Sequence, residues 1–503
     1  MELFSDRPGD QGLPGRQRAL AMSAVMLLTI MAVFDGTMIN IALPHIAQSL
    51  EVSTSAAIWV TNGYLLTTVM TLALFAALAA RVGFRTQFTV GLVVFVLASA
   101  GCAAATSLPM LVAMRLLQGL GGAATLSIAP AIHRSIFPNR LLGRILGINA
   151  LLIATCTAAA PLLAGAMLSL LDWRWLFAIN VPLGLVALLM CIRVLPNQKS
   201  DTKAPFDIAG AIWSALMLGA VIMAVEAISP SSTASSSTTP SSIDQASQQQ
   251  WLRAAAFAAL AIVSGVAFVR RQRRAPAPLL PLSLFSSMRF SLAALTSLAS
   301  FVSQGITFVA LPILFQSVYG YNALIAALLF IPWPLGIMLS APHAGRLSDR
   351  HSPALVSTVG LLIFSLGLIA LALLPAEPNV WDIAARSLLC GLGFGYFQSP
   401  NNREMLGNAP RELSSYASGV LSIVRTFGQC MGAACVGVAL ALLVSSTMTA
   451  QQSLPLQAEA LHYSLWLAAA SSVAALALSY SRTRRARQES AAPAEASVSR
   501  SQS

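Results

Sequence analysis

Long apolar stretches separated by short polar connections run along almost the whole chain. About 20 mostly apolar residues suffice to cross the hydrocarbon core as a helix. Helices are required there because each backbone amide must find its hydrogen bond within the segment. The pattern therefore predicts an all-α, polytopic membrane protein with fourteen transmembrane helices. Their expected ranges are 20–43, 58–80, 86–106, 109–131, 143–170, 175–195, 208–228, 251–269, 289–317, 323–343, 354–374, 381–401, 416–444 and 463–481.

Composition agrees with this pattern. The chain has 503 residues, of which 56% are hydrophobic and only 10% are charged. A chain this poor in polar residues cannot cover the surface of a soluble protein, so most soluble enzymes are excluded. The six cysteines lie inside apolar stretches without metal-ligand spacing, and we expect neither a metal site nor a cofactor.

The formal net charge of +12 is distributed unevenly along the chain. Basic residues lie mainly in the two tails and in every second connection, while the remaining connections carry mostly acids. The positive-inside rule assigns the basic connections to the cytoplasm. We therefore expect both termini in the cytoplasm, and we attribute the positive charge to membrane orientation and not to nucleic-acid binding.

Four landmarks recur along the chain at nearly constant offsets of 268 to 272 residues. They pair Leu43-Pro44 with Leu311-Pro312, Arg81 with Arg350, Arg115 with Arg386, and Pro138 with Pro410. Such repeats are typical of secondary transporters, whose substrate site lies where the repeats meet. The sequence thus predicts two six-helix repeats with two inserted helices between them.

This duplication predicts five regions. The expected boundaries are 1–19 for a cytoplasmic N-terminal tail, 20–195 for the N-terminal six-helix bundle, 208–269 for two inserted helices with a disordered outer loop at 229–250, 289–481 for the C-terminal six-helix bundle, and 482–503 for a disordered cytoplasmic tail.

Among the ionisable residues of the predicted spans, five are candidates for a role, namely Asp35, Arg115, Glu226, Arg386 and Arg425. Placing such a residue in mid-membrane costs about 2.5–3.5 kcal/mol on insertion scales, so it usually faces a cavity or a partner. Burial favours the neutral form of a carboxyl group and a nearby cation favours its charged form. Asp35 is therefore our candidate for a group that exchanges protons with substrate; alternatively, it caps a broken helical turn beside Gly36.

The other four ionisable residues each have one or two possible roles. Arg115 and Gln118 share one helix face, and Gly119 and Gly122 allow a neighbouring helix to approach that face. Arg115 could tune the proton affinity of Asp35, or it could be structural, as a fixed ion pair or a tie to a backbone carbonyl. Glu226 is either a second acid that attracts cations or a residue that snorkels to the interface. We expect Arg386 and Arg425 to tie helices together.

Five distinctive motifs occur in order along the chain. They are Asp35-Gly-Thr-Met-Ile-Asn40-Ile-Ala-Leu-Pro44, Trp59-Val-Thr-Asn-Gly-Tyr64, Arg115-Leu-Leu-Gln118-Gly119-Leu-Gly121-Gly122, Trp173-Arg-Trp-Leu-Phe-Ala-Ile-Asn180-Val-Pro182-Leu-Gly184 and Gln398-Ser-Pro400-Asn401-Asn402. With these motifs the chain resembles the major facilitator superfamily and, within it, the fourteen-span drug:proton antiporters of bacteria. The resemblance covers nearly the whole chain.

The resemblance implies a proton and substrate site that includes Asp35, Asn40, Arg115 and Gln118, with Arg115 as a coupling residue. It also implies an inner gate formed by two related loops, whose residues here are Arg81, Gly83 and Arg85 in one half and Gly345, Asp349 and Arg350 in the other.

Two family motifs are altered in this chain. The first gating loop has Ala80 where the family has an acid, so its latch either rests on Asp349 alone or is weaker. The glycine-rich antiporter motif of the fifth span is reduced to Ala160-Pro161-Leu-Leu-Ala-Gly165, in which Pro161 and Gly165 remain as candidates for helix packing.

These observations predict a proton-coupled exporter of amphipathic, cationic, toxic compounds in the bacterial inner membrane. The expected partners are small organic substrates, protons and the lipid bilayer, with a periplasmic adaptor and an outer-membrane channel as further candidates. An exporter of one metabolite, such as a siderophore or an amino acid, is the first alternative. A membrane receptor or scaffold without transport is the second. An enzyme is not expected, because the sequence lacks nucleotide-binding, metalloprotease and serine-hydrolase motifs.

Overall fold

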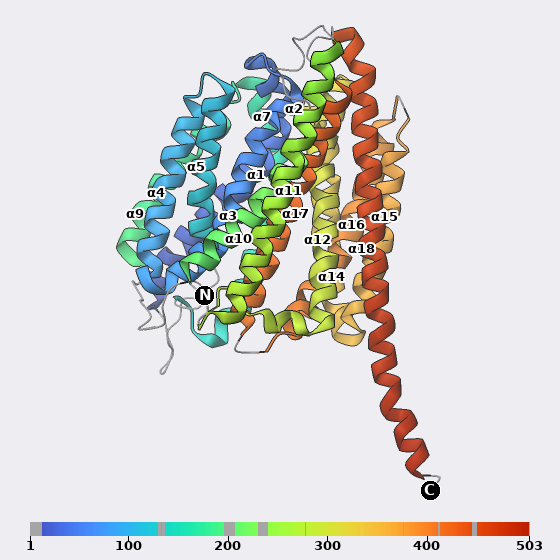
Figure 1. The fold of residues 1–503 in the computed structure, drawn as a ribbon. Coiled ribbons are helices and arrows are strands. Elements are labelled where there is room, and N and C mark those ends of the chain that lie inside the picture. Colours follow the sequence, from blue (N-terminus) through green and yellow to red (C-terminus); the bar gives the residue numbers. More distant parts are fainter. Residues whose placement is uncertain are drawn as a thin grey trace.

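The computed structural model describes residues 13–128, 132, 136–195, 207–229, 240–276, 278–375, 377–410, 413–444 and 450–501. Regular structure in these ranges is helical, and the long helices run side by side as one bundle (Figure 1). Twelve segments of this described part are long and apolar enough to cross a membrane. Two further helices, which are less apolar and carry Arg115 and Arg386, complete the fourteen predicted crossings. The all-α polytopic class is therefore confirmed.

The N-terminal half contains six crossings. Its helices are α1 (Gly15–Ser49), α2 (Thr54–Ala57), α3 (Trp59–Val82), α4 (Phe84–Ala103), α5 (Leu108–Leu126), α7 (Asn139–Leu170), α8 (Trp175–Ala178) and α9 (Asn180–Val194). Helix α5 packs against α3 and α4, while α1 packs against α7 and α9. The polar face of α5 is consequently turned toward its neighbours and away from lipid.

The C-terminal half repeats this arrangement. It is built from η3 (Leu282–Ser286), α12 (Met288–Ile313), η4 (Leu314–Val318), α13 (Ala323–Phe330), α14 (Pro332–Arg350), α15 (Pro353–Ala372), α16 (Val380–Gly407), α17 (Ser414–Leu443) and α18 (Ala450–Ser501). Helix α16 packs against α14 and α15, as α5 packs against α3 and α4 in the other half.

Matched glycines make the same close approaches in both halves. A Cβ on Gly119 would lie 2.5 Å from the carbonyl oxygen of Tyr64 on α3, and one on Gly391 would collide with α14 at the carbonyl of Trp333. Two residues later, Gly121 and Gly393 meet the backbones of α4 and α15 in turn. Equivalent glycines thus allow the fourth helix of each half to pack closely against its neighbours, which confirms the predicted duplication.

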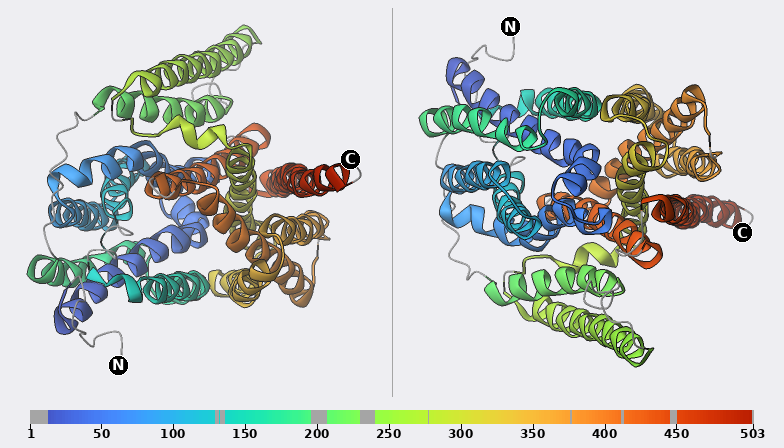
Figure 2. Two further views of the ribbon diagram at one scale, coloured as in Figure 1. Left: turned by 90° about the horizontal axis from the view of Figure 1, so that it is seen from below. Right: turned by 90° about the horizontal axis from the view of Figure 1, so that it is seen from above.

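The inserted helices α10 (Ile208–Glu226) and α11 (Pro240–Arg274) lie side by side at the edge of the bundle (Figure 2). Helix α10 packs against α3 of one half and α17 of the other. Asp207 joins the pair where α10 begins. Its carboxylate accepts hydrogen bonds from the backbone N–H of Gly210 at 3.0 Å, from Arg271 Nε at 2.7 Å and from Gln272 Nε2 at 3.0 Å.

These contacts predict a dependence of stability on pH. Burial raises the pKa of Asp207, but the hydrogen bonds from Arg271 and Gly210 and the charge of Arg271 outweigh burial and lower it. A lowered pKa in the folded state means that the stabilisation is complete above the unfolded pKa and is lost as pH falls. The melting temperature of wild type should therefore exceed that of Asp207→Asn at neutral pH, and the difference should shrink as pH falls below 3.8. A difference that does not change with pH would contradict this account.

Several boundaries differ from those predicted. Helix α11 begins at Pro240, inside the predicted outer loop, of which residues 230–239 lie outside the described part. Helix α18 continues through Arg482 and Thr483, which the sequence placed in the tail; both side chains are buried. Of the predicted N-terminal tail, residues 1–12 are not described. Helix α1 begins and α18 ends at the same end of the bundle, which we call the terminal end (Figure 1).

Candidate functional site

A buried carboxylate, Asp35, lies within α1. Its residue is 2% exposed, and side chains from α5 and α9 donate hydrogen bonds to it. Nη1 of Arg115 lies 2.6 Å from Oδ2, and Nε2 of Gln118 lies 2.9 Å from Oδ1. Nδ2 of Asn180 lies 3.4 Å from Oδ1. The structure therefore surrounds the charge of Asp35 with a cation and two amides.

Arg115 has acceptors besides Asp35. Its Nε donates to the carbonyl oxygen of Val60 on α3 at 2.7 Å, and its Nη1 also contacts Oε1 of Gln118 at 2.7 Å. The residue is only 1% exposed. Because a buried ion pair needs further hydrogen bonds to offset desolvation, these contacts let the pair exist inside the bundle.

Gln118 extends the network to α4. Its Nε2 lies 2.9 Å from the hydroxyl oxygen of Ser99, while its spacing from Arg115 places both side chains on one face of α5. We call Asp35, Arg115, Gln118, Ser99 and Asn180 the Asp35 cluster. Sequence reasoning missed Ser99, which stands in an apolar stretch without a motif. It gave no role to Asn180, although that residue belongs to one of the motifs that carried the resemblance.

Two glycines and two aromatic rings complete the surroundings of Arg115. Gly119 and Gly122 bring α3 close, since a Cβ on Gly122 would lie 2.8 Å from the hydroxyl of Tyr64. The ring centroids of Tyr64 and Phe177 lie 4.6 and 5.7 Å from the guanidinium carbon. Such distances allow favourable cation–π contacts, so the cation has partners besides Asp35.

Asp35 does not cap a broken turn. Helix α1 is continuous from Gly15 to Ser49, and the carboxylate bonds to other helices and not to its own backbone. The next residue, Gly36, is exposed, and a Cβ there would meet nothing within 4 Å. The buried carboxylate is therefore one residue away from open space.

Asn40 lies outside the Asp35 cluster. Its Oδ1 accepts a hydrogen bond from the hydroxyl of Thr61 on α3 at 3.0 Å. It therefore joins α1 to α3 further along the bundle than Asp35.

Glu226, at the end of α10, points into the bundle. Nδ2 of Asn62 on α3 donates to its Oε1 at 2.7 Å, and Asn62 is 0% exposed. Snorkelling to the interface is therefore the wrong interpretation, because the carboxylate has a buried polar partner. Glu226 also lines a cavity of about 240 Å³. The other lining residues are Trp59, Met223, Ala227, Ser229, Gln250, Arg253 and Phe257.

The first gating loop joins α3 to α4. Arg81 is exposed near the end of α3, and Gly83 connects the helices with a φ of 93°, a conformation that favours glycine. Arg85 donates a hydrogen bond to the carbonyl of Ile192 on α9, in the same half.

The residues predicted for the second gating loop, Gly345, Asp349 and Arg350, lie in the last turns of α14 and are helical. Arg350 is exposed, and a Cβ on Gly345 would lie 3.7 Å from the hydroxyl of Ser399 on α16. The side chain of Asp349 lies outside the described residues, so a latch that rests on it stays a prediction.

The two halves meet at the end of the bundle opposite the terminal end. A Cβ on Gly165 of α7 would lie 2.8 Å from the Cα of Leu324 on α13, and buried Pro161 lies one turn earlier in α7. Nε2 of Gln316 on η4 donates to the carbonyl of Ile41 on α1 at 2.9 Å. The reduced antiporter motif thus supplies a close helix contact between the halves.

The predicted ties at Arg386 and Arg425 have different outcomes. Arg386 pairs with Asp382 at 2.7 Å and donates to the carbonyl of Ala370, so it does link α16 to α15. Arg425 forms neither a hydrogen bond nor an ion pair with any residue of the described ranges. Its guanidinium lies over the ring of Phe301 on α12, so it contacts a neighbouring helix only through this cation–π interaction.

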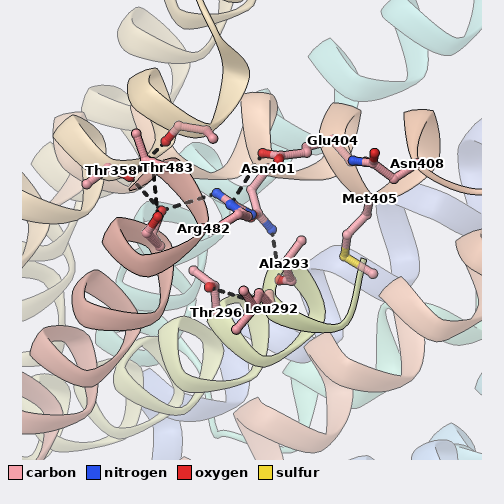
Figure 3. Close-up of polar contacts among 12 residues, drawn as sticks. Leu292, Ala293, Thr296, Thr358, Asn401, Glu404, Met405, Asn408, Arg482 and Thr483 are labelled. Carbon is pink, nitrogen blue, oxygen red and sulfur yellow. Dashed lines mark hydrogen bonds and ion pairs between the residues drawn. The ribbon is translucent and has the colours of Figure 1, made fainter. Parts of the chain in front are cut away.

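A second buried arginine network lies in the C-terminal half (Figure 3). Arg482 Nη1 donates to Oδ1 of Asn401 at 2.7 Å, and Arg482 Nε lies 3.4 Å from Oε2 of Glu404. Asn401 in turn donates to the hydroxyl of Ser297 on α12 at 2.7 Å. Sequence reasoning missed this network because it placed Arg482 in the tail. Its members belong to α12, α16 and α18, so it stabilises one half internally.

Two related six-helix halves are the architecture of a secondary transporter. The chain belongs to the Major Facilitator Superfamily, whose model matches residues 25–433. It is a transporter and not an enzyme.

Known proteins support this assignment. The chain is 42% identical to the uncharacterized transporter YebQ of Escherichia coli, over 85% of this chain and 90% of that protein. It is 30% identical to the tetracenomycin C resistance and export protein of Streptomyces glaucescens, over 86% and 77% of the two chains. The fold matches a bacterial homologue of the human lysosomal transporter Spinster, with a TM-score of 0.67, 16% identity and coverage of 95% and 98%.

Proposed function

We propose that this chain is a proton-coupled exporter of small amphipathic organic compounds, of the fourteen-span drug:proton antiporter type. The observation that carries the proposal is the Asp35 cluster, in which a cation and two amides hold a buried carboxylate whose neighbour Gly36 borders open space. Similarity to an export protein that confers resistance supports export as the direction of transport. We place the chain in a bacterial inner membrane with both termini in the cytoplasm, following the charges of its connections.

Protonation of Asp35 is the proposed coupling step. A proton on Oδ2 removes the charge that attracts Arg115, whose Nη1 lies 2.6 Å away. Arg115 then keeps the carbonyl of Val60 and Oε1 of Gln118 as acceptors, so the cation is not left without partners. Release of the proton restores the ion pair. Each half-cycle therefore changes the force between α1 and α5. Because α1 also accepts a hydrogen bond from Gln316 of the other half, the change acts on the contact between the halves and biases their rocking.

The charge preference of the substrate needs a basis other than Asp35. The prediction of a cationic substrate depended on acids without basic neighbours near the first span. In the structure Asp35 and Arg115 form an ion pair with no net charge. The proposal therefore specifies an amphipathic compound without a preferred charge, and it assigns the Asp35 cluster a role in proton coupling alone.

Proteoliposomes with an imposed pH gradient test this proposal. The gradient should drive uptake of rhodamine dyes, and adding dye should accelerate collapse of the gradient, reported by pyranine trapped inside. Both effects should be absent in liposomes without protein. Uptake that is insensitive to the gradient would refute proton coupling. Transport of a single metabolite with no effect of any dye would favour the alternative of a dedicated exporter.

A further inference from the structure

Polar side chains follow one face of α17 in its first half. Ser418, Ser422, Arg425 and Gln429 are spaced by four, three and four residues, which places them on one side of the helix. Ser422 and Arg425 are exposed, and a Cβ on nearby Gly419 would meet nothing within 4 Å. This side of α17 therefore borders open space.

The residues that extend this polar face toward the end of α17 show which part of the bundle the face is turned to. Ala433, Val436 and Leu440 extend the same face and are buried in the core cluster that also contains Met38 and Ile41 of α1. Another face of α17 carries Gly428 and Gly432 against α12. A third carries Ile423 and Phe427 within the cluster shared with α3 and α10. The polar face is therefore directed toward the region between the two halves.

Arg425 is the charged member of this face and has no polar partner among the described residues. Its guanidinium carbon lies 5.8 Å from the ring centroid of Phe301 on α12. Arg425 stands well inside α17, where exposure to lipid would cost about 2.5–3.5 kcal/mol on insertion scales. A guanidinium in this position needs water or an anionic ligand. Its neighbour Gln429 is held by Gln304 at 3.1 Å, so that side chain is already positioned.

The charge balance favours an anionic ligand. The ion pair of Asp35 with Arg115 adds no net charge. Glu226, the last residue of α10, is bonded to Asn62. Asn62 contacts α17 through Cys430, which lies on a different face of that helix from Arg425. We propose that Arg425 binds a carboxylate, or a group of similar charge, on the transported compound. This inference rests on the proposed function and adds the charge class of the substrate to it.

Binding of two matched dyes tests the proposal. Rhodamine B carries a free carboxylate, whereas its ethyl ester has the same cationic ring system without the acid. Fluorescence anisotropy with purified wild type should show tighter binding of rhodamine B by about tenfold, since a charge-assisted hydrogen bond contributes on that order. Arg425→Gln should remove the preference, and Arg425→Lys should reduce it because lysine lacks the planar fork.

Arg270→Gln is the matched control. It also removes one exposed arginine, but from the end of α11, and should keep the wild-type preference. The proposal is overturned if wild type does not prefer the carboxylate dye, or if Arg425→Gln keeps the preference. Should Arg425→Gln fail to fold, an undiminished preference in Arg425→Lys has the same consequence. Binding is measured without a gradient, so failure of proton coupling in vesicles would refute the proposed function separately.

Discussion

Transport driven by a pH gradient should be abolished in Asp35→Asn, with the folded protein retained. Asparagine keeps the shape of the side chain but cannot release a proton, so the proposed coupling step is lost. Its oxygen can still accept a hydrogen bond from Arg115 or Gln118. Arg115 also keeps the carbonyl of Val60 at 2.7 Å and the rings of Tyr64 and Phe177, so the structure tolerates the lost charge.

The measurement compares rhodamine uptake in proteoliposomes with and without the gradient. Wild type should show gradient-dependent uptake, and Asp35→Asn should fall to the level of liposomes without protein. Asp172→Asn is the control, because Asp172 forms an exposed ion pair with Arg174 at 3.2 Å, outside the Asp35 cluster. Undiminished gradient-driven uptake by Asp35→Asn would remove Asp35 from the mechanism.

The fold could be predicted from the sequence because its physical causes are periodic. Apolar stretches of membrane length give the helices, and the recurrence of Arg115 and Arg386 with the glycines that follow gives the duplication. The glycines act in the same way in each half, since Gly119 and Gly391 both meet the backbone of the second crossing helix. Such contacts depend on local spacing, which a single sequence displays.

The functional site was only partly predictable, because the duplication does not extend to its chemistry. The offset of 268 that relates Leu43-Pro44 to Leu311-Pro312 places Ser303, which is not an acid, at the position that corresponds to Asp35. Arg386 consequently pairs with Asp382 on its own helix. Ser99 reaches Gln118 and Asn180 reaches Asp35 only through the packing of remote helices. No local pattern marks Ser99, and the motif that contains Asn180 does not show which side chain it meets.

The predicted end of the last helix was wrong for a related reason. Arg482 is charged and follows the last apolar stretch, so the sequence placed it in the tail. In the folded chain Asn401, Glu404 and Ser479 surround it, and it is 0% exposed. A charge inside a bundle is acceptable when partners are present, but those partners lie 3 to 81 residues away along the chain.

Arg115→Ala should cause the largest loss of folded protein. It removes the cation that lies 2.6 Å from the Asp35 carboxylate, whose side chain is 0% exposed, and leaves that charge buried without a counterion. Breaking a buried pair on one side typically costs about 3–5 kcal/mol. We expect little monodisperse protein in fluorescence-detected size-exclusion chromatography, and a lowered melting temperature for what remains. Retention of folded protein at the wild-type level would mean that the pair contributes little to stability.

Two further variants separate structural and coupling roles of Arg115. The double variant Asp35→Asn with Arg115→Gln contains neither charge, so it should recover folded protein relative to Arg115→Ala but should not couple transport to the gradient. Arg115→Lys keeps a cation but cannot reproduce both the contact to Val60 and the contact to Asp35. Its transport should therefore persist with an altered pH profile, because the proposed coupling step depends on the contact between this cation and Asp35. A profile identical to wild type, together with recovery in the double variant, would assign Arg115 a structural role alone.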